Sequence, residues 1–244
     1  MNRRNFLAMT AALPALTPGF ANANANGRRP QVALIMDDLG YRASDSYAAL
    51  DLPKELTVAI LPHTRHSTAL AEGAAAFDHE VMLHMPMQAT NGKFLGLGGL
   101  TVDMPGGELS ELMDVAFASV PGAQGFNNHM GSAFTITEEP LNAVMARATQ
   151  HVDFFIDSVT HAKTIASQIA RQHGLKTARR DVFLDDANDR LDVPARARTL
   201  LRRTGELPTI AICHPRPETL EFLQTEWNWL EDHFELVPAS QVVS

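Results

Sequence analysis

After residue 30, short apolar runs alternate with longer stretches of helical periodicity, and this alternation repeats about seven times. Val32–Met36, Leu56–Leu61 and Thr209–Cys213 are almost wholly apolar, as strands buried on both faces are. Glu108–Val120 instead places its apolar residues on one helical face. Strands and helices that alternate in this way form parallel sheets covered by helices. The sequence therefore predicts an α/β fold.

The remaining elements follow the same pattern. Further strands are predicted within residues 78–84, 123–126, 153–158, 177–185 and 234–238, and further helices over residues 41–50, 67–76, 139–150, 161–173, 192–203 and 217–232. Residues 89–107 are rich in glycine and have no clear period, so we expect a long surface loop there. The sequence shows no internal repeat or linker after residue 30, which favours a single domain over residues 26–244.

Two adjacent acids, Asp37 and Asp38, end the first apolar run and lie just before Gly40. Carboxylates inside a buried strand are costly, so we expect both at its C-terminal end, where the chain leaves the core. One acid could then bind a cation while the other moves a proton. The alternative is that the pair only caps the next helix or shapes a turn.

Other predicted strands also end in polar residues. In a barrel-like α/β fold the C-terminal ends of the strands converge on one face, where catalytic groups collect. One polar strand end would mean little, but a series of them on otherwise apolar strands indicates a site. The residues at these ends are Asp37, Asp38, His84, Asn128, His129, Asp157, Arg180, Asp181 and His214.

Composition narrows the chemistry of such a site. The formal net charge of -8 argues against a nucleic-acid partner. Because Cys213 is the one cysteine, neither an internal disulfide nor a cysteine-rich zinc site can form. Cys213 itself lies in a predicted buried strand and is expected to be a core residue. Any metal must therefore be held by histidine and carboxylate.

The predicted metal ligands are Asp38, His84 and His129. Imidazole and carboxylate suit zinc and other first-row divalent ions, and three protein ligands leave positions open for water and substrate. Zinc is the favoured ion. Asp37 could take a proton from that water, and His214 could donate one to a leaving group, which completes a set for metal-assisted hydrolysis. The alternative for each histidine, taken singly, is a structural or surface role.

The N-terminal residues predict export. Residues 2–7, Asn-Arg-Arg-Asn-Phe-Leu, resemble a twin-arginine signal, and small residues further on offer cleavage after Ala23 or Ala25. The apolar stretch between them is interrupted by Pro14 and Pro18 and is too short for a membrane-spanning helix. We therefore expect residues 1–25 to be an export signal and the mature protein to be periplasmic, with no integral membrane span. The alternatives are an anchor or a disordered tail.

Seven blocks of sequence match a known family in order. They are Ile35–Tyr41, Ala59–Pro62, His79–Met87, Asn127–Ser132, Phe155–Ser158, Arg180–Asp185 and His214–Thr219. Together they resemble the divergent branch of the polysaccharide deacetylase family, over essentially all of the mature region. The resemblance implies a distorted (β/α) barrel of about seven mostly parallel strands.

For activity, the resemblance implies metal-dependent removal of N- or O-linked acetyl groups from polysaccharides. It places a base at Asp37, metal ligands at Asp38 and His84, and a catalytic acid at His214. The wider family has a second histidine where this chain has Gln88.

Two functions fit these residues and the differences from the wider family. The favoured one is an exported enzyme that uses a divalent metal to remove acetyl groups from an envelope or extracellular carbohydrate, with Asn128, Asp157, Arg180 and Asp181 as predicted substrate-binding residues. For Arg180 and Asp181 the alternative is a structural ion pair. The second function is a catalytically weak or inactive barrel that binds envelope glycan or a protein partner, and Gln88 motivates it. A hydrolase acting on a non-sugar amide or ester is a third, less favoured reading.

A second departure supports the same alternative. The Arg-Pro-Pro-Tyr block of the wider family is absent, and residues 127–132 occupy its place in the order. His129, in that segment, is expected to replace the missing second histidine as a ligand. The residues indicate no particular protein partner.

Overall fold

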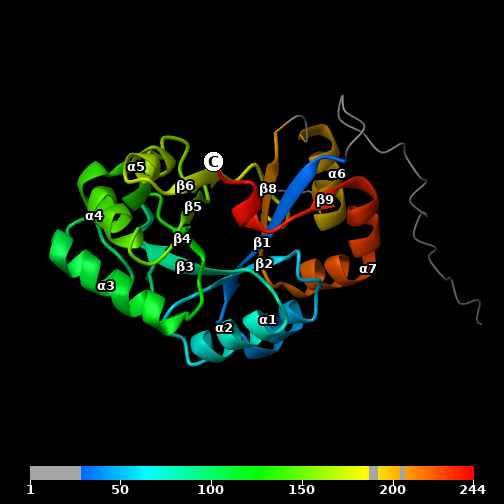
Figure 1. Cartoon of the computed structure of the whole chain (residues 1–244), viewed down its shortest axis with the longest axis horizontal. Helices are drawn as coiled ribbons and strands as arrows, with labels where there is room; N and C mark the ends of the chain where they lie inside the picture. The colour runs from blue at the N-terminus through cyan, green and yellow to red at the C-terminus, as the bar shows by residue number, and fades with distance from the viewer. Residues whose placement is uncertain (1–28, 187–191, 204–206) are drawn as a thin grey trace, which may run out of the picture.

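The computed structural model describes residues 29–186, 192–203 and 207–244. In these ranges nine strands form one parallel sheet, and seven α-helices cover its outer side (Figure 1). The strands are β1 (Gln31–Leu39), β2 (Thr57–Ile60), β3 (Val81–Met87), β4 (Gly125–Met130), β5 (Phe154–Asp157), β6 (Lys176–Arg179), β7 (Val182–Phe183), β8 (Thr209–Cys213) and β9 (Glu235–Leu236). The helices are α1 (Ala43–Leu50), α2 (Ser67–Ala76), α3 (Gly106–Ser119), α4 (Glu138–Ala148), α5 (Ala166–Gln172), α6 (Val193–Arg203) and α7 (Pro217–His233). The predicted export signal, residues 1–25, lies outside the described residues.

The strand order makes the sheet a half-barrel. It runs β6-β5-β4-β3-β2-β1-β8-β7, with β9 paired to β1, and every pairing is parallel. The helices follow the outside of this curve from α5 round to α6 (Figure 1). The predicted α/β fold, a distorted (β/α) barrel, is therefore confirmed, with nine strands in the described residues instead of about seven.

Side-chain alternation along the strands separates two hydrophobic clusters. On β1, Ala33 and Ile35 belong to an inner cluster, whereas Val32 and Leu34 belong to a larger outer cluster that packs against the helices. This is the period of two that a strand imposes. The inner cluster continues across the sheet with Ala59, Met82, Phe154, Ile156, Ile210, Ile212 and Ala239. Polar residues that continue the inner phase at the strand ends therefore point into the barrel.

The predicted single strand over residues 177–185 is wrong. β6 pairs with β5, whereas β7 pairs with β8 at the opposite edge of the sheet. The change of edge occurs between two residues: Arg180 N donates to Asp157 O (2.9 Å) and Asp181 N donates to Ile210 O (2.9 Å). The chain between β6 and β7 thus closes the barrel, although these two edge strands do not pair with each other. The local sequence cannot reveal the break between β6 and β7, because it results from pairing with β5 and β8, which are distant in the sequence.

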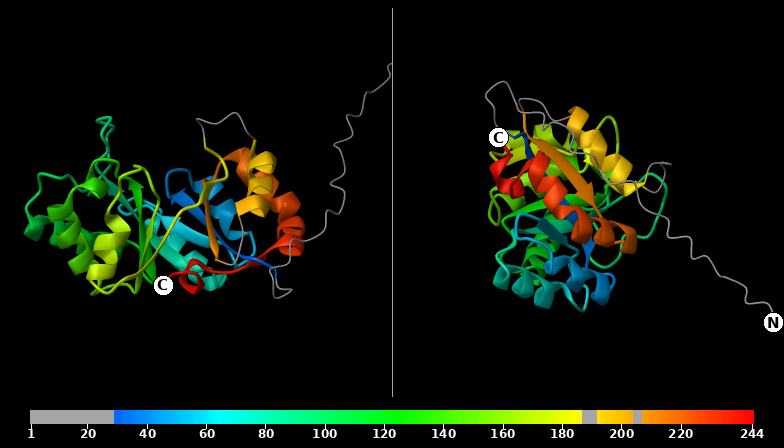
Figure 2. Two further views of the ribbon diagram at one scale, coloured as in Figure 1. Left: turned by 90° about the horizontal axis from the view of Figure 1, so that it is seen from above. Right: turned by 90° about the vertical axis from the view of Figure 1, so that its right-hand side faces the viewer.

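The C-terminal residues cover the end of the barrel where the strands begin. The short 3₁₀ helix η2 (Ala239–Gln241) lies against the start of β3, with Ser240 N donating to Glu80 Oε1 (3.1 Å). Ser244 exchanges backbone hydrogen bonds with Thr177, at the start of β6. The C-terminus accordingly lies at the opposite end of the barrel from the projecting loop after β3 (Figure 2). The other end, formed by the C-terminal ends of the strands, is left for the site.

Several predicted boundaries shift. β3 continues past His84 to Met87, and β4 continues past Phe126 to Met130. The predicted loop over residues 89–107 is nearly as expected, but α3 already begins at Gly106. The predicted helix over residues 161–173 begins only at Ala166, after a turn. Among the described residues no helix has the length and apolar character needed to cross a membrane.

Candidate metal and catalytic site

A β-bulge near the end of β1 brings Asp37 and Asp38 to the same site. Met36 pairs with Val58 and Leu39 with Ile60, so β1 has one more residue than β2 in this interval. Asp38 also has a φ of 63°, in the left-handed region that non-glycine residues seldom adopt. In a regular strand two adjacent side chains point to opposite faces, and the bulge removes that constraint.

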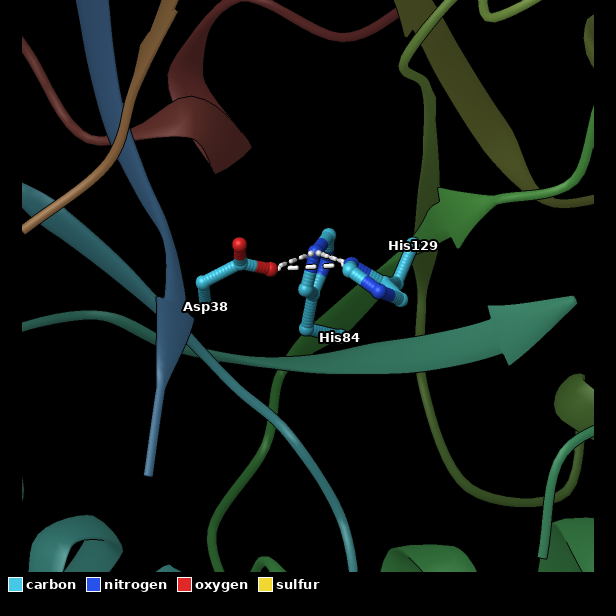
Figure 3. Close-up of side chains that lie close together, drawn as sticks. All are labelled: Asp38, His84 and His129. Carbon is cyan, nitrogen blue, oxygen red and sulfur yellow. Dashed lines mark hydrogen bonds and ion pairs between the residues drawn. The ribbon is translucent and has the colours of Figure 1, made fainter. Parts of the chain in front are cut away.

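The three predicted metal ligands converge. Asp38 Oδ1 lies 2.8 Å from His129 Nδ1 and 3.1 Å from His84 Nε2, and the two histidine nitrogens lie 3.1 Å apart. Asp38 and His129 lie near the C-terminal ends of β1 and β4, whereas His84 lies in the middle of β3, and the three side chains point toward one another (Figure 3). Ligands about 2.1 Å from one divalent ion are roughly 3 to 3.4 Å apart. These distances are therefore near those that a single small ion requires.

Electrostatics at the cluster favour positive charge. Burial would raise the pKa of Asp38, but the hydrogen bonds from His129 and His84 hold it well below its usual range, so Asp38 is ionised. Burial would lower the pKa of His84, but Asp37 and Asp38 outweigh it and raise that pKa to about 9. The two carboxylates next to this imidazole thus favour its protonated form. A bound cation could offset their negative charge in place of that proton.

Asn127 orients both the ligand histidine and the second acid. His84 Nδ1 donates to Asn127 Oδ1 (2.7 Å), which leaves Nε2 of His84 facing the ligand cluster. Asn127 Nδ2 donates to Asp37 Oδ1 (2.7 Å). The sequence reasoning named its neighbour Asn128 and missed Asn127. The period of two along a strand could have identified Asn127, because it lies two residues from the ligand His129 and on the same strand face.

Asp37 is a buried carboxylate beside the cluster. Its side chain is 3 % exposed, and Oδ1 lies 3.7 Å from His84 Nδ1. Burial raises the pKa of Asp37, while His84 and His214 offset part of that shift. A carboxylate with a raised pKa accepts a proton more readily at neutral pH than an exposed one does.

His214 and Asp38 line a cavity of about 240 Å³ together with Tyr41. Asp185 holds the imidazole: its Oδ1 accepts from His214 Nδ1 (2.8 Å), and its Oδ2 accepts from His214 N (2.8 Å). Burial lowers the pKa of His214, but the bond to Asp185 outweighs this and raises it. The sequence reasoning did not assign Asp185 a role, because a contact between a residue after β7 and a residue after β8 has no local signature.

Asp185→Asn should shift the pH dependence of catalysis. If His214 acts as an acid, activity is lost as pH rises through its pKa, and removing the Asp185 charge lowers that pKa. The alkaline limb of kcat should therefore move to lower pH, with kcat reduced about tenfold. Steady-state rates across pH measure this. Asp114→Asn is the matched control, because Asp114 forms a similar 2.8 Å bond to His151 on the surface. An unmoved alkaline limb in Asp185→Asn would separate His214 from the acid role.

Two predicted substrate-binding residues direct their side chains to nearby backbone and side-chain groups. Asn128 accepts from Ser158 N (3.0 Å) and donates to Met130 O (2.7 Å). Asp157 accepts from Val159 N (2.9 Å) and from Thr164 Oγ1 (2.9 Å). The structure does not bring either residue into the ligand cluster; their role in binding substrate stays a prediction.

The other two, Arg180 and Asp181, line a separate and larger cavity. Arg180 donates to the carbonyls of Ser158 (2.7 Å) and Val159 (3.1 Å), and its guanidinium lies 3.8 Å from the centre of the Phe183 ring. Asp181 Oδ2 accepts from Ile210 N (2.9 Å). Arg180 is therefore held by the segment after β5 and Asp181 by β8, and their role in substrate binding also stays a prediction.

Gln88 serves the loop after β3. Its Oε1 accepts from Val102 N (2.8 Å), and its backbone N donates to Leu100 O (2.9 Å). The side chain thus fixes the far end of the 89–107 segment, and it is not part of the His/Asp cluster found among the described residues.

The fold and site together define a class of protein. A parallel (β/α) half-barrel with this architecture is shared with solved proteins at low identity. One is an uncharacterized protein from Agrobacterium tumefaciens C58, with a TM-score of 0.80 and 20% identity over 92% of this chain and 99% of that one. Another is a CE4 family pseudoenzyme from Bacillus anthracis, with a TM-score of 0.52 and 14% identity over 88% of this chain and 66% of that one. The class that these likenesses define is one of fold, a parallel (β/α) half-barrel that this chain shares with both proteins.

Sequence comparison makes the assignment more specific. The profile of the divergent polysaccharide deacetylases matches residues 34–243, and the protein belongs to that family. It is also similar to the uncharacterized protein YibQ of Escherichia coli K12, with 35% identity over 245 residues that cover 99% of this chain and 74% of that protein.

Proposed function

We propose that this protein is an exported, metal-dependent hydrolase that removes acetyl groups from an envelope or extracellular carbohydrate. One observation carries the proposal: a three-residue ligand cluster, a buried carboxylate with a raised pKa and a carboxylate-bound histidine lie close to one another. Metal-assisted hydrolysis needs these groups together. The family assignment supports the carbohydrate and the acetyl group as the target.

The donor set suits a divalent cation, and zinc fits best among the common ions. Asp38, His84 and His129 would hold it through one oxygen and two nitrogens, as in catalytic zinc sites with three protein ligands. When bound, such an ion supplies a Lewis acid and lowers the pKa of a coordinated water. Asn127 keeps His84 in the tautomer that offers Nε2.

The chain's own residues handle the two protons of the reaction. Asp37 takes a proton from the water whose oxygen forms the new bond to the acetyl carbon. His214 donates a proton to the sugar nitrogen or oxygen as its bond to the acetyl carbon breaks. The products are acetate and the free amine or alcohol. Asp185 keeps Nδ1 of His214 engaged, so that Nε2 is the nitrogen directed to the leaving group.

Export is proposed from the N-terminal sequence. The twin-arginine-like residues 2–7 and the small residues up to Ala25 support translocation to the periplasm. Cell fractionation tests this: a shortened protein is expected in the periplasmic fraction, and a full-length protein retained in the cytoplasm would contradict it.

A second candidate function is favoured by Gln88. A glutamine that is bonded to Val102 N cannot act as the second histidine of the wider family. On this view the protein is a weak or inactive deacetylase-like barrel that binds envelope glycan or a protein partner.

Acetate release separates the two functions. Mature protein loaded with Zn²⁺ is incubated with an N-acetylated aminosugar polymer, and acetate is measured enzymatically. The proposed function expects release that stops on chelation and returns when metal is restored. Bound metal and bound polymer without any acetate would instead support the binding protein.

A further inference from the structure

A second cavity of about 840 Å³ lies beside the proposed catalytic site. Its walls come from the segment after β5, from the crossing between β6 and β7, from β7 and from α6. The lining residues on which the argument depends are Arg180, Asp181, Phe183, Arg196, Arg202 and Arg203. The cavity is larger than the one that Asp38 and His214 line, and no step of the proposed reaction uses it.

The cavity is cationic on an acidic protein. Four arginines line it against two acids, Asp181 and Asp186, although the whole chain has a formal net charge of -8. The acid Asp181 is engaged, because its Oδ2 accepts from Ile210 N. A concave surface with excess guanidinium groups concentrates anions and binds carboxylate or phosphate through paired N–H donors.

One face of the helix α6 contributes arginine side chains to this cavity. Arg196, Thr199 and Arg203 follow a spacing of i, i+3 and i+7, which places them on one side of a helix, and all three line the cavity. Arg198 is on the same helix and is exposed, but it is not among the lining residues. The sequence of α6 contains no acidic residue. The residues of α6 therefore carry a net positive charge.

Phe183 connects the cavity to the proposed catalytic site. Its ring stacks on that of His214, with centroids 5.8 Å apart and planes at 27°. Arg180 lies over the same ring at 3.8 Å, and the carbonyls of Ser158 and Val159 hold its guanidinium there. One ring, that of Phe183, therefore contacts both His214 and the arginine-lined cavity.

We propose that this cavity binds an anionic group of the substrate, so that the enzyme prefers an acidic acetylated carbohydrate to a neutral one. This rests on the proposed function and specifies its substrate class. The shared chemistry is an anionic oxygen pair or trio, from a carboxylate on the sugar or from a phosphate ester.

Binding of three disaccharides by calorimetry tests the proposal without requiring turnover. The probes are di-N-acetylchitobiose, which is neutral, N-acetylglucosaminyl-N-acetylmuramic acid, which carries a carboxylate, and di-N-acetylchitobiose with one phosphate ester. The wild-type protein should bind at least one acidic probe about tenfold more tightly than the neutral one at low salt, and the preference should shrink as salt is added. The acidic probe that gains more identifies the anion.

The double variant Arg202→Gln/Arg203→Gln should reduce this preference to about twofold or less, since it removes two guanidinium groups from the cavity. Arg198→Gln is the matched control, and it should keep the wild-type preference. Equal affinity of the wild-type protein for all three probes, binding of none of them, or a double variant with unchanged preference would overturn the inference. These outcomes differ from a failure of the proposed function, which would appear as selective binding of acidic probes without acetate release.

Discussion

Asp38→Ala should leave the protein unable to retain its divalent ion and should reduce acetate release by at least about 10³-fold, because a catalytic metal contributes several kcal/mol of transition-state stabilisation. Asp38 Oδ1 is the atom that both histidines contact, at 2.8 Å and 3.1 Å. Without it, His84 and His129 lose the anion that partly neutralises the cation. Metal content after purification, measured by mass spectrometry, should fall from about one ion per chain to near zero.

Matched variants distinguish the loss of the Asp38 carboxylate from strain in its backbone. Asp38 has a φ of 63°, which asparagine tolerates better than alanine, so Asp38→Asn removes the charge with less strain. We expect it to lose metal as well. His129→Ala should lose metal too, whereas His161→Ala, on a loop away from the cluster, should not. Full metal occupancy in His129→Ala would show that His129 is not a ligand.

Much of the architecture could be predicted because the signals are local. Apolar runs and helical periods indicate a parallel α/β fold, and the strand ends of such a fold meet. The predictions of Asp38, His84 and His129 as ligands followed from that rule, and the structure brings these three side chains together. The period of two along the strands could also have shown which polar residues point away from the site. Asn128 and Asp157 are in phase with Phe126 and Phe155 of the outer cluster, which directs them away from the barrel interior.

Other features depend on contacts that the local sequence does not encode. Asp38 would face away from the barrel in a regular strand, and a bulge defined by pairing with β2 brings it in. A single strand is predicted within residues 177–185, but pairing with β5 and with β8 places its two halves at opposite edges of the sheet. Gln88 reads as a lost ligand, whereas its bond to Val102, 14 residues away, gives it a loop-fixing role. In each case a distant partner decides the local conformation.

Asp37→Asn should keep the metal and lose most of the activity. The substitution preserves the shape of the side chain, and its amide oxygen can still accept from Asn127 Nδ2, which now lies 2.7 Å from Asp37 Oδ1. The ligand cluster does not include Asp37, so its three donors are retained. An amide cannot accept the proton of the attacking water, and a positioned base contributes roughly 10²- to 10⁴-fold. Acetate release should fall by that factor, with metal content unchanged.

Glu80→Gln is the control for removing a buried carboxylate as such. Glu80 is buried like Asp37, but it lies at the start of β3, where it accepts from Ser240 N at the opposite end of the barrel. Its substitution should leave kcat unchanged even where stability falls. If Asp37→Asn also keeps the wild-type rate while binding metal, Asp37 is not the base, and its burial beside Asn127 and His84 is then structural. If Asp37→Asn loses both metal and activity, Asp37 acts through His84, whose Nδ1 lies 3.7 Å away, by supporting the ligand cluster instead of moving a proton.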